Sequence, residues 1–428
     1  MSKNLVLVES PAKGKTIEKY LGTDFKVLAT YGHVRDLVSK TGAVIPDQGF
    51  EMNYEISEDS KKQLTRITKA VEQARTLYLA TDLDREGEAI AWHVQEILKE
   101  RGLLADKEVH RVVFNAVTKR AVQDSIKHPK VVSDSLVNAY KARRALDHLF
   151  GFNLSPLMWE KIAPKLSAGR VQSPALRLIV EREDQISAFE PQEYWTIGAI
   201  AKHKDEVFKA RLSKYGGEKT KQFSFTNEKA VREVEGAIKA SADGILTVGK
   251  VEKKQRQRKP TAPFITSTLQ QEASRKLGFS ARQTMMTAQR LYEGIDVGDG
   301  SVGLITYMRT DSVTLAGEAI TEIRSLVQDR YGTENLPDEP RTYQTKTQNA
   351  QEAHEAIRPT DFSREPNHVS GYLDSDGQKL YQLIWKRAVA SLSLIHISEP
   401  TRRYAIAYGG VGLKKKRGGG GGGGGGGG

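Results

Sequence analysis

Acidic side chains follow two short apolar runs near the N-terminus. Glu9 directly follows LVLV, and Asp82, Asp84 and Glu86 occupy alternate positions that begin at the last residue of TLYLATD. Alternate side chains of an extended segment share one side, so these three carboxylates are expected to converge. Hard carboxylate oxygens suit Mg²⁺, which neutralises charge on phosphate oxygens during phosphoryl transfer. The pattern predicts a Mg²⁺ site formed by these four acids, with a solvated acidic turn as the simpler alternative.

The segment VESPAKGKTIEKY contains GKT, the last three letters of a phosphate-binding P-loop. The first glycine of that pattern lets backbone amides wrap a phosphate, but its position is occupied here by Glu9. Pro11 removes one of the required amides. We therefore expect no nucleoside triphosphate at this turn.

Strands and helices alternate around these acids. LVLV predicts a strand, and Ser10 followed by Pro11 marks the start of a helix over PAKGKTIEKYL. TLYLATD predicts a second strand that ends in acid, followed by a helix over EGEAIAWHVQEILKE. The pattern is typical of an α/β domain, in which functional residues lie at the carboxyl ends of the strands.

Composition narrows the possible partners. The chain has 428 residues, 38% of them hydrophobic, and contains no apolar run long enough to cross a membrane. It has no cysteine, which excludes disulfides and zinc–thiolate sites and suits a reducing cytoplasm. The net charge is +12, of which +5 lies beyond residue 392, so the remaining chain carries +7. This basic balance favours a polyanionic partner such as nucleic acid, although many basic proteins are merely solvated.

Beyond the α/β domain the predicted secondary structure and the composition change several times along the chain. A helical, arginine-rich part is followed by a β-rich part, a basic connector (KVEKKQRQRKPTAP) and a second helical part. The connector is either a hinge or a solvated loop. The last residues show no amphipathic period, end in a run of glycines and resemble a translated sequencing adaptor, so we expect a non-native, low-complexity tail. The predicted divisions are 1–130, 131–190, 191–259, 260–391 and 392–428.

Several motifs in a fixed order resemble those of the bacterial type IA DNA topoisomerases. They are VESPAKGKTI, YGHVRDL, TDLDREGEAIAWH, LSAGRVQSPALRLI, GLITYMRTDS and EAHEAIRP. A glutamate after the first strand with a later DxDxE is the pattern of the Toprim domain, and the resemblance runs from residue 2 to about residue 391. It implies an α/β Toprim domain, mainly helical domains and a β-rich arch, arranged in an incomplete toroid.

The resemblance also implies roles for individual residues. Tyr307, in GLITYMRTDS, would be the nucleophile that attacks a DNA phosphodiester, although an arbitrary tyrosine is more often a core residue. Arg309 and Lys13 would supply positive charge at the phosphate. Glu9 would protonate the departing 3′ oxygen and act as the base on religation. His354, in EAHEAIRP, would order the scissile phosphate, with Arg358 a weaker candidate in the same motif.

A path for single-stranded DNA is expected along the arginine-rich helices. Arginines spaced along a helix can follow a phosphate backbone without reading its sequence. Phe150, Phe152 and Trp159 could stack on unpaired bases, although buried packing is the commoner use of such rings. By resemblance the DNA contacts are His33, Arg143, Arg144, Asp147, Trp159, Ser167, Ala168, Gly169, Arg170, Val171, Gln172 and Arg309.

The implied enzyme is an ATP-independent isomerase. It would cut one strand through a 5′-phosphotyrosyl link, pass a strand, reseal the cut and relax negative supercoils, as a monomer on underwound DNA in the cytoplasm and nucleoid. Two alternatives remain: a Toprim-type nuclease or primase, and a DNA-binding remnant without catalysis. The resemblance stops near Ser391, where the family's return segments begin, so we expect this chain to be unable to complete a relaxation cycle.

Overall fold

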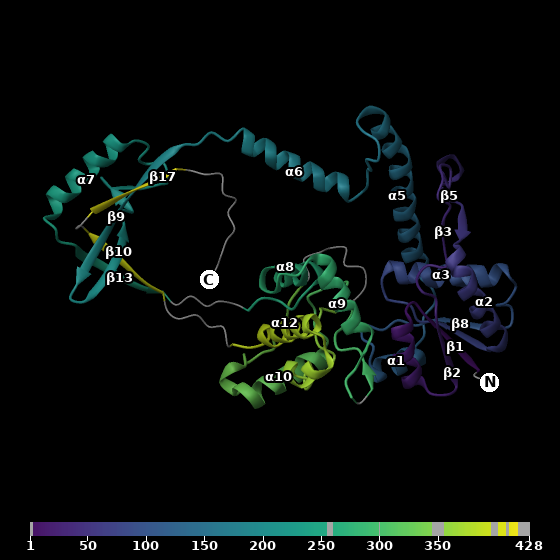
Figure 1. Cartoon of the computed structure of the whole chain (residues 1–428). Coiled ribbons are helices and arrows are strands. Elements are labelled where there is room, and N and C mark those ends of the chain that lie inside the picture. The colour runs from purple at the N-terminus through teal and green to yellow at the C-terminus, as the bar shows by residue number, and fades with distance from the viewer. Residues whose placement is uncertain are drawn as a thin grey trace. The chain divides into compact units, whose positions relative to one another are not determined.

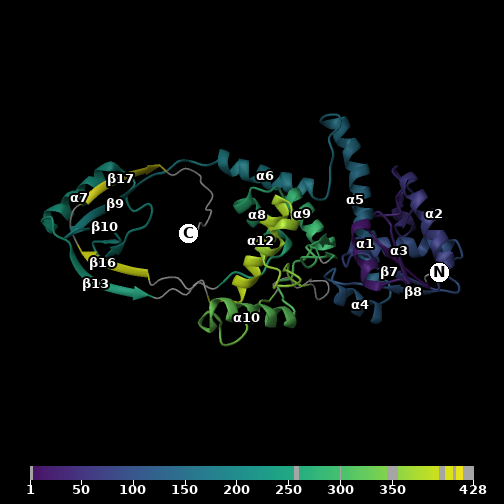
Figure 2. The same cartoon turned by 60° about the horizontal axis from the view of Figure 1, so that its bottom comes forward.

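The computed structural model describes residues 3–254, 260–298, 300–344 and 355–394, with the backbone alone for 251–254, 401–407 and 411–417. The chain divides into two compact units. The first contains Met1–Ala168 and Lys259–Ile397, and the second contains Gly169–Arg258 and Ser398–Gly428 (Figures 1 and 2). Each unit is described by itself.

The first unit combines an α/β part with a helical part. Its first elements are β1 (Asn4–Val8), α1 (Pro11–Leu21), β2 (Phe25–Ala29), β3 (Arg35–Leu37), β4 (Val44–Ile45), β5 (Glu51–Met52), β6 (Tyr54–Ile56), α2 (Glu58–Gln73), β7 (Thr76–Leu79), α3 (Arg85–Glu100), β8 (Glu108–Arg111), α4 (Lys119–Lys127) and α5 (Asp134–Lys161). The helical part contains α8 (Thr266–Leu277), α9 (Ala281–Glu293), β14 (Ile295–Asp296), β15 (Ser301–Val302), α10 (Gly317–Tyr331), α11 (Pro366–Val369) and α12 (Ser375–Ser391).

A parallel sheet with the order β2-β1-β7-β8 forms the centre of the α/β part. Strand β1 lies between β2 and β7, with Leu7 opposite Leu79. Because both strands run in the same direction, the residues that follow them emerge at one edge of the sheet. Glu9 and Asp82 are thereby brought together from positions far apart in the sequence. The predicted strands and helices around the acids are confirmed.

The two faces of this sheet are covered differently. Leu5 and Leu7 of β1 pack with α2 and α3, whereas Val6 and Val8 point to the opposite face. There they share one hydrophobic core with Ile17 of α1 and with buried residues of α8, α9 and α12. The α/β part and the second helical part therefore fold around a common core, with α8, α9 and α12 lying close together in Figures 1 and 2.

Helix α5 rises beside the short strand pairs β3–β6 and β4–β5 (Figure 1). Ala145 of α5 packs with Leu37 and Val44 in a small separate core, which fixes the position of this helix. The helix carries charged residues in its first half and at its end, with no Asp, Glu, Lys or Arg between Asp147 and Glu160. Neither α5 nor any other helix in the described ranges is long and apolar enough to cross a membrane.

The second unit is β-rich, as predicted, and also contains helices. Its elements are α6 (Gln172–Ser187), β9 (Glu193–His203), β10 (Glu206–Arg211), β11 (Lys214–Tyr215), β12 (Glu218–Lys219), α7 (Glu228–Ala242), β13 (Thr247–Lys254), β16 (Thr401–Ala407) and β17 (Val411–Arg417). Trp195 and Ile197 of β9 form its core with Val231 and Ile238 of α7. Helix α7 was not predicted.

Two of these strands come from the C-terminal segment that was expected to be a low-complexity tail. Strand β17 pairs with β9, and β16 pairs with β13, both in antiparallel register. Backbone pairing at an open sheet edge needs only N–H and C=O groups, so a segment without an amphipathic pattern can supply it. The tail's non-native origin stays a prediction.

Candidate active site

A buried lysine joins two of the predicted acids. Ser10 caps α1 by accepting a hydrogen bond from the amide of Lys13 (3.2 Å). This turn directs the Lys13 side chain inward, where it is fully buried. Its Nζ lies 3.1 Å from Glu9 Oε1 and 2.8 Å from Asp82 Oδ1. Lys13 therefore pairs with both acids, and its contact with a phosphate stays a prediction.

Burial and pairing assign a charge to each member of this cluster. Burial is the main cause that raises the pKa of Glu9 to about 8, although Lys13 opposes the shift. Burial works against ionisation of Asp82, but Lys13 overcomes it and lowers the pKa of that carboxyl. The same two acids outweigh the burial of Lys13 and raise its pKa. At neutral pH, Asp82 and Lys13 form an ion pair while Glu9 holds a proton, the state that a general acid requires.

The acids after β7 do not lie in an extended segment, so the expected convergence by alternation is wrong. Helix α3 starts at Arg85, with Asp84 as its N-cap: Asp84 Oδ1 accepts a hydrogen bond from Gly87 N (2.8 Å). Aspartate is a strong N-cap: its own backbone stays extended, but the residues after it, including Glu86, are helical. A Cβ atom on Gly87 would come within 2.2 Å of Asp82 O, so glycine allows the helix to start against the loop.

The predicted nucleophile lies beside Asp84. Its segment is held by backbone hydrogen bonds from Tyr307 N to Asn115 O (2.7 Å) and from Gly303 N to Val117 O (3.0 Å). The Tyr307 hydroxyl donates to Asp84 Oδ2 at 2.6 Å, and its side chain is largely buried. Burial, followed by the charges of Asp82 and Asp84, raises the pKa of this phenol far above its ordinary value, while Arg309 opposes the shift.

One cavity of about 550 Å³ collects most of the predicted catalytic and metal residues. Among its lining residues are Glu9, Asp82, Asp84, Glu86, Tyr307 and Arg309. The Arg309 side chain is more than half exposed, and its Nη1 lies 3.5 Å from Asp84 Oδ2. The arrangement places a phenol, a protonated carboxyl and an arginine around one space large enough for a phosphodiester.

The donor set of this cavity suits a hard cation, although the acids are not gathered into one cluster. In the described ranges no three His, Cys, Asp or Glu side chains are placed to hold a metal together. Glu9 and Asp82 share Lys13. Asp84 and Glu86 are the more accessible pair, and Mg²⁺ commonly uses only one or two carboxylates and keeps several waters.

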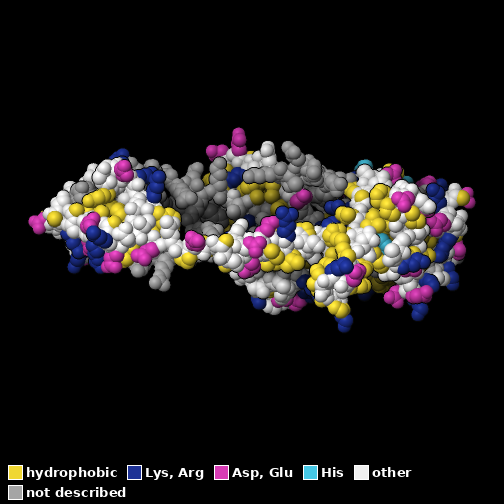
Figure 3. Space-filling view, turned by 90° about the horizontal axis from the view of Figure 1, so that it is seen from above, with side chains coloured by type: hydrophobic (Ala, Val, Ile, Leu, Met, Phe, Trp, Pro, Cys, Tyr) yellow, Lys and Arg dark blue, Asp and Glu magenta, His cyan; other side chains and the backbone are white. Residues whose placement is uncertain are grey.

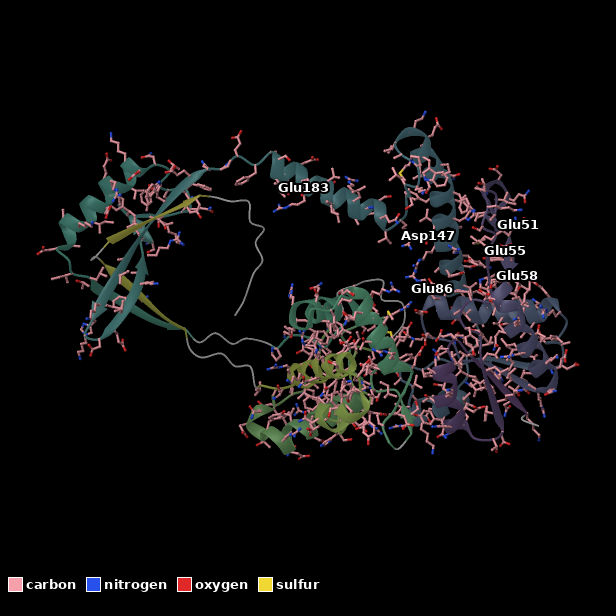
Figure 4. The ribbon with its side chains drawn as sticks, viewed as in Figure 1. Glu51, Glu55, Glu58, Glu86, Asp147 and Glu183 are labelled. Atoms are coloured by element: carbon pink, nitrogen blue, oxygen red, sulfur yellow. The ribbon has the colours of Figure 1, made fainter. Side chains whose placement is uncertain are left out.

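Glu86 connects the cavity to the predicted DNA path. Its carboxylate lies 3.1 Å from Arg143 Nη1 and 3.5 Å from His33 Nε2. The hydrogen bond from His33 is the main cause that lowers the pKa of Glu86; Arg143 lowers it further, while burial opposes the shift. A second cavity of about 860 Å³ is lined by His33, Asp84, Glu86, Arg143 and Arg309. Figure 4 shows Glu86 near the foot of α5 and Asp147 farther up the same helix, 3.9 Å from Arg143.

Other predicted DNA contacts lie farther from this cavity. Arg144 forms a double hydrogen bond with Asp36, at 2.8 and 2.6 Å, toward the β3–β6 strands. Trp159 is half exposed and donates its indole N–H to Leu166 O. Ala168 N donates to Ser155 Oγ at 3.2 Å in the loop that includes Ser167. On the face drawn in Figure 3, basic and acidic side chains are interspersed and form no single basic area.

The remaining predicted residues fall into three groups. Gly169, Arg170, Val171 and Gln172 belong to the second unit, with Gln172 starting α6. His354 lies outside the described residues. Arg358 pairs with Glu355, and these two residues line another cavity.

Two buried residues at the site were not predicted. Arg111 donates to the backbone oxygens of Leu79, Thr81 and Asp82, at 2.9, 2.9 and 2.6 Å, and so holds the acidic loop in shape. The sequence signal that could have identified Arg111 is its position directly before the apolar run VVF, where a charged side chain needs buried partners. Tyr292 lies against Tyr307, but its position in the amphipathic helix MMTAQRLYE marks it only as a core residue.

Two parts of the chain match known protein families. Residues 4–117 match the Toprim domain and residues 131–416 match the DNA topoisomerase family. DNA topoisomerase 1 of Xylella fastidiosa (strain 9a5c) is 57% identical over 392 residues, which are 91% of this chain and 48% of that protein. The corresponding protein of Rickettsia bellii is 53% identical over 388 residues, 90% of this chain and 48% of the relative. The chain thus spans about half the length of these relatives.

A solved structure also matches. Full-length topoisomerase I from Thermotoga maritima is similar with a TM-score of 0.78 and 35% identity, over 96% of this chain and 65% of that one. The fold class and the family predicted from the motifs are confirmed. The chain belongs to the DNA topoisomerase family, and residues 4–117 are its Toprim domain.

Proposed function

We propose that the native protein is a type IA DNA topoisomerase. It would cleave one strand of underwound DNA, pass a strand through the break and reseal it without ATP, relaxing negative supercoils. The observation that carries the proposal is the single cavity that holds the Tyr307 hydroxyl, the protonated Glu9 and Arg309.

In the proposed cleavage step, Tyr307 Oη attacks the scissile phosphorus and forms a 5′-phosphotyrosyl bond while the bond to the 3′ oxygen breaks. Glu9 gives its proton to that oxygen, and the phenolic proton passes to Asp84, whose Oδ2 accepts the hydrogen bond of the hydroxyl, and from there to water. Arg309 offsets negative charge on the phosphate. The link conserves the energy of the phosphodiester, so the reverse reaction reseals the strand with Glu9 as base.

Mg²⁺ would be held by Asp84 and Glu86. When bound, it would supply positive charge for the phosphate oxygens. Lys13 would act through Glu9 and Asp82 as a positioning residue. His33 and Arg143 would contact the strand that leads to the cavity, and single-stranded DNA in the bacterial cytoplasm would be the partner of a monomer.

Trapping the covalent intermediate tests this proposal. The chain is incubated with Mg²⁺ and an oligonucleotide labelled on the 3′ side of the cut, and the reaction is stopped with denaturant. The expected result is a labelled protein band with wild type and none with Tyr307→Phe. An equal band from both chains would refute the nucleophile, whereas cleavage without any band would indicate a Toprim-type nuclease. Binding alone would indicate a DNA-binding remnant.

A further inference from the structure

Tyr292 occupies the centre of the junction between the helical part and the Toprim domain. It lies in the last turn of α9 and is fully buried. Its hydroxyl donates to Phe114 O at 3.5 Å, and it lies near enough to the Asp82 carboxyl to help lower the pKa of that group. The Lys13 ammonium stands 5.8 Å from the centre of its ring and 4.9 Å from that of Phe114. Tyr292 therefore contacts the buried acid–lysine cluster from the side of the nucleophile.

The Tyr292 ring also packs against the ring of Tyr307. The two ring centres are 5.2 Å apart, with an angle of 67° between the planes. This edge-to-face geometry is favourable beyond the apolar area it buries. Since the Tyr307 hydroxyl is held at its other end by Asp84, contacts at both the ring and the oxygen fix the phenol.

The backbone near Tyr292 is also joined to the nucleophile segment. Leu304 N donates to Leu291 O at 2.7 Å. A Cβ atom on Gly303 would come within 2.4 Å of Tyr292 O, so this segment lies directly against the end of α9. Movement of Tyr292 would consequently displace the chain that carries Tyr307.

We propose that Tyr292 is a positioning residue for the nucleophile: its ring packs against the ring of Tyr307 and keeps the Tyr307 hydroxyl within hydrogen-bond distance of Asp84. The inference rests on the cleavage reaction proposed above. A misplacement of about 1 Å in a reacting group can cost on the order of 10²-fold in rate. Loss of the ring should therefore reduce cleavage without reducing DNA binding.

The test uses three variants of the full chain. Tyr292→Phe keeps the ring, Tyr292→Leu removes it, and Tyr381→Leu removes an equally buried tyrosine on α12. The rate of covalent adduct formation should remain near wild type in Tyr292→Phe and Tyr381→Leu and fall about 10²-fold in Tyr292→Leu. Affinity for the oligonucleotide, measured by fluorescence anisotropy, should be unchanged in all three. An unchanged rate in Tyr292→Leu, or an equal loss in Tyr292→Phe, would overturn the proposal.

A spectroscopic measurement separates this inference from the proposed function. The chain is produced with 3-fluorotyrosine, and the Tyr307 fluorine resonance is assigned by its loss in Tyr307→Phe. That resonance should shift in Tyr292→Leu and stay in place in Tyr381→Leu. An unchanged resonance in Tyr292→Leu would overturn the positioning role, even if wild type formed no adduct. Should Tyr292→Leu fail to fold, Tyr292→Phe decides alone: a displaced Tyr307 resonance there would contradict a role of the ring.

Discussion

The Glu9 carboxyl has a pKa well above its ordinary value in water. Burial raises its pKa to about 8, so the carboxyl is protonated at neutral pH and loses its proton as the pH rises through that value. If Glu9 protonates the leaving 3′ oxygen, the rate of strand cleavage should be constant near pH 7 and fall above about pH 8. Single-turnover cleavage of a labelled oligonucleotide across this range measures the effect.

The matched variant is Glu9→Gln, which keeps the shape of the side chain and removes the acidic proton of the carboxyl group. General-acid catalysis contributes about 10²- to 10⁴-fold, so cleavage should fall by roughly that factor and lose its decline above pH 8. DNA affinity should change little. Equal losses of cleavage and affinity would contradict the acid–base role.

Lys13 contributes to stability as well as to the site. Removing one partner of a buried ion pair leaves an unpaired charge and costs about 3–5 kcal/mol. Lys13→Met should lower the free energy of unfolding in urea by that amount, because Asp82 remains buried. Lys15→Met, at an exposed position of the same helix, should change it by less than about 0.5 kcal/mol. Similar small effects of both changes would show that the pair does not stabilise the fold.

At the scale of elements, the start of α3 sets the position of the acidic loop. Gly87→Ala would place a methyl group 2.2 Å from Asp82 O, so either the loop or the helix must shift. Such overpacking costs about 1–3 kcal/mol, and cleavage should fall as well because Asp82 and Asp84 move. Gly151→Ala, where no atom lies within 4 Å, should instead stabilise α5 slightly. Thermal unfolding of both variants measures the contrast.

Local sequence patterns predicted the elements better than the contacts between them. Ser10 and Pro11 marked the start of α1, and the apolar runs before Glu9 and Asp82 are strands. The alternation of Asp82, Asp84 and Glu86 was misleading because Asp84 caps a helix, a local hydrogen bond that competes with extended backbone. Arg111 and Tyr292 were missed because their roles depend on long-range packing that no local pattern encodes.

At the scale of the molecule, the site exists because two sequence-distant parts share one core. Glu9 and Asp84 come from the Toprim domain, and Tyr307 comes from a segment more than 200 residues later. The motifs predicted both parts, but their common core depends on the packing of Val6 and Val8 against the later helices. The sequence motifs therefore predicted which residues form the site, but not the distances between their side chains.

Arg143, at the cavity of about 860 Å³, should contribute to the affinity for single-stranded DNA by contacting a phosphate. Each phosphate neutralised on single-stranded DNA steepens the dependence of log affinity on log salt by about 0.7. Arg143→Ala should weaken binding and reduce that slope by about this amount, since Arg143 lines the cavity beside Glu86. Arg66→Ala, on the exposed surface of α2, should leave the slope unchanged. Anisotropy titrations at several salt concentrations measure both.

The most direct test of the whole account is to identify the amino acid that carries the DNA after cleavage. The chain is allowed to react with a single-stranded oligonucleotide and Mg²⁺, denatured, digested with protease and nuclease, and analysed by mass spectrometry. The proposed mechanism predicts a 5′-phosphonucleotide on Tyr307 and on no other of the 15 tyrosines. A nucleotide on a different residue, or cleaved DNA with unmodified Tyr307, would contradict it.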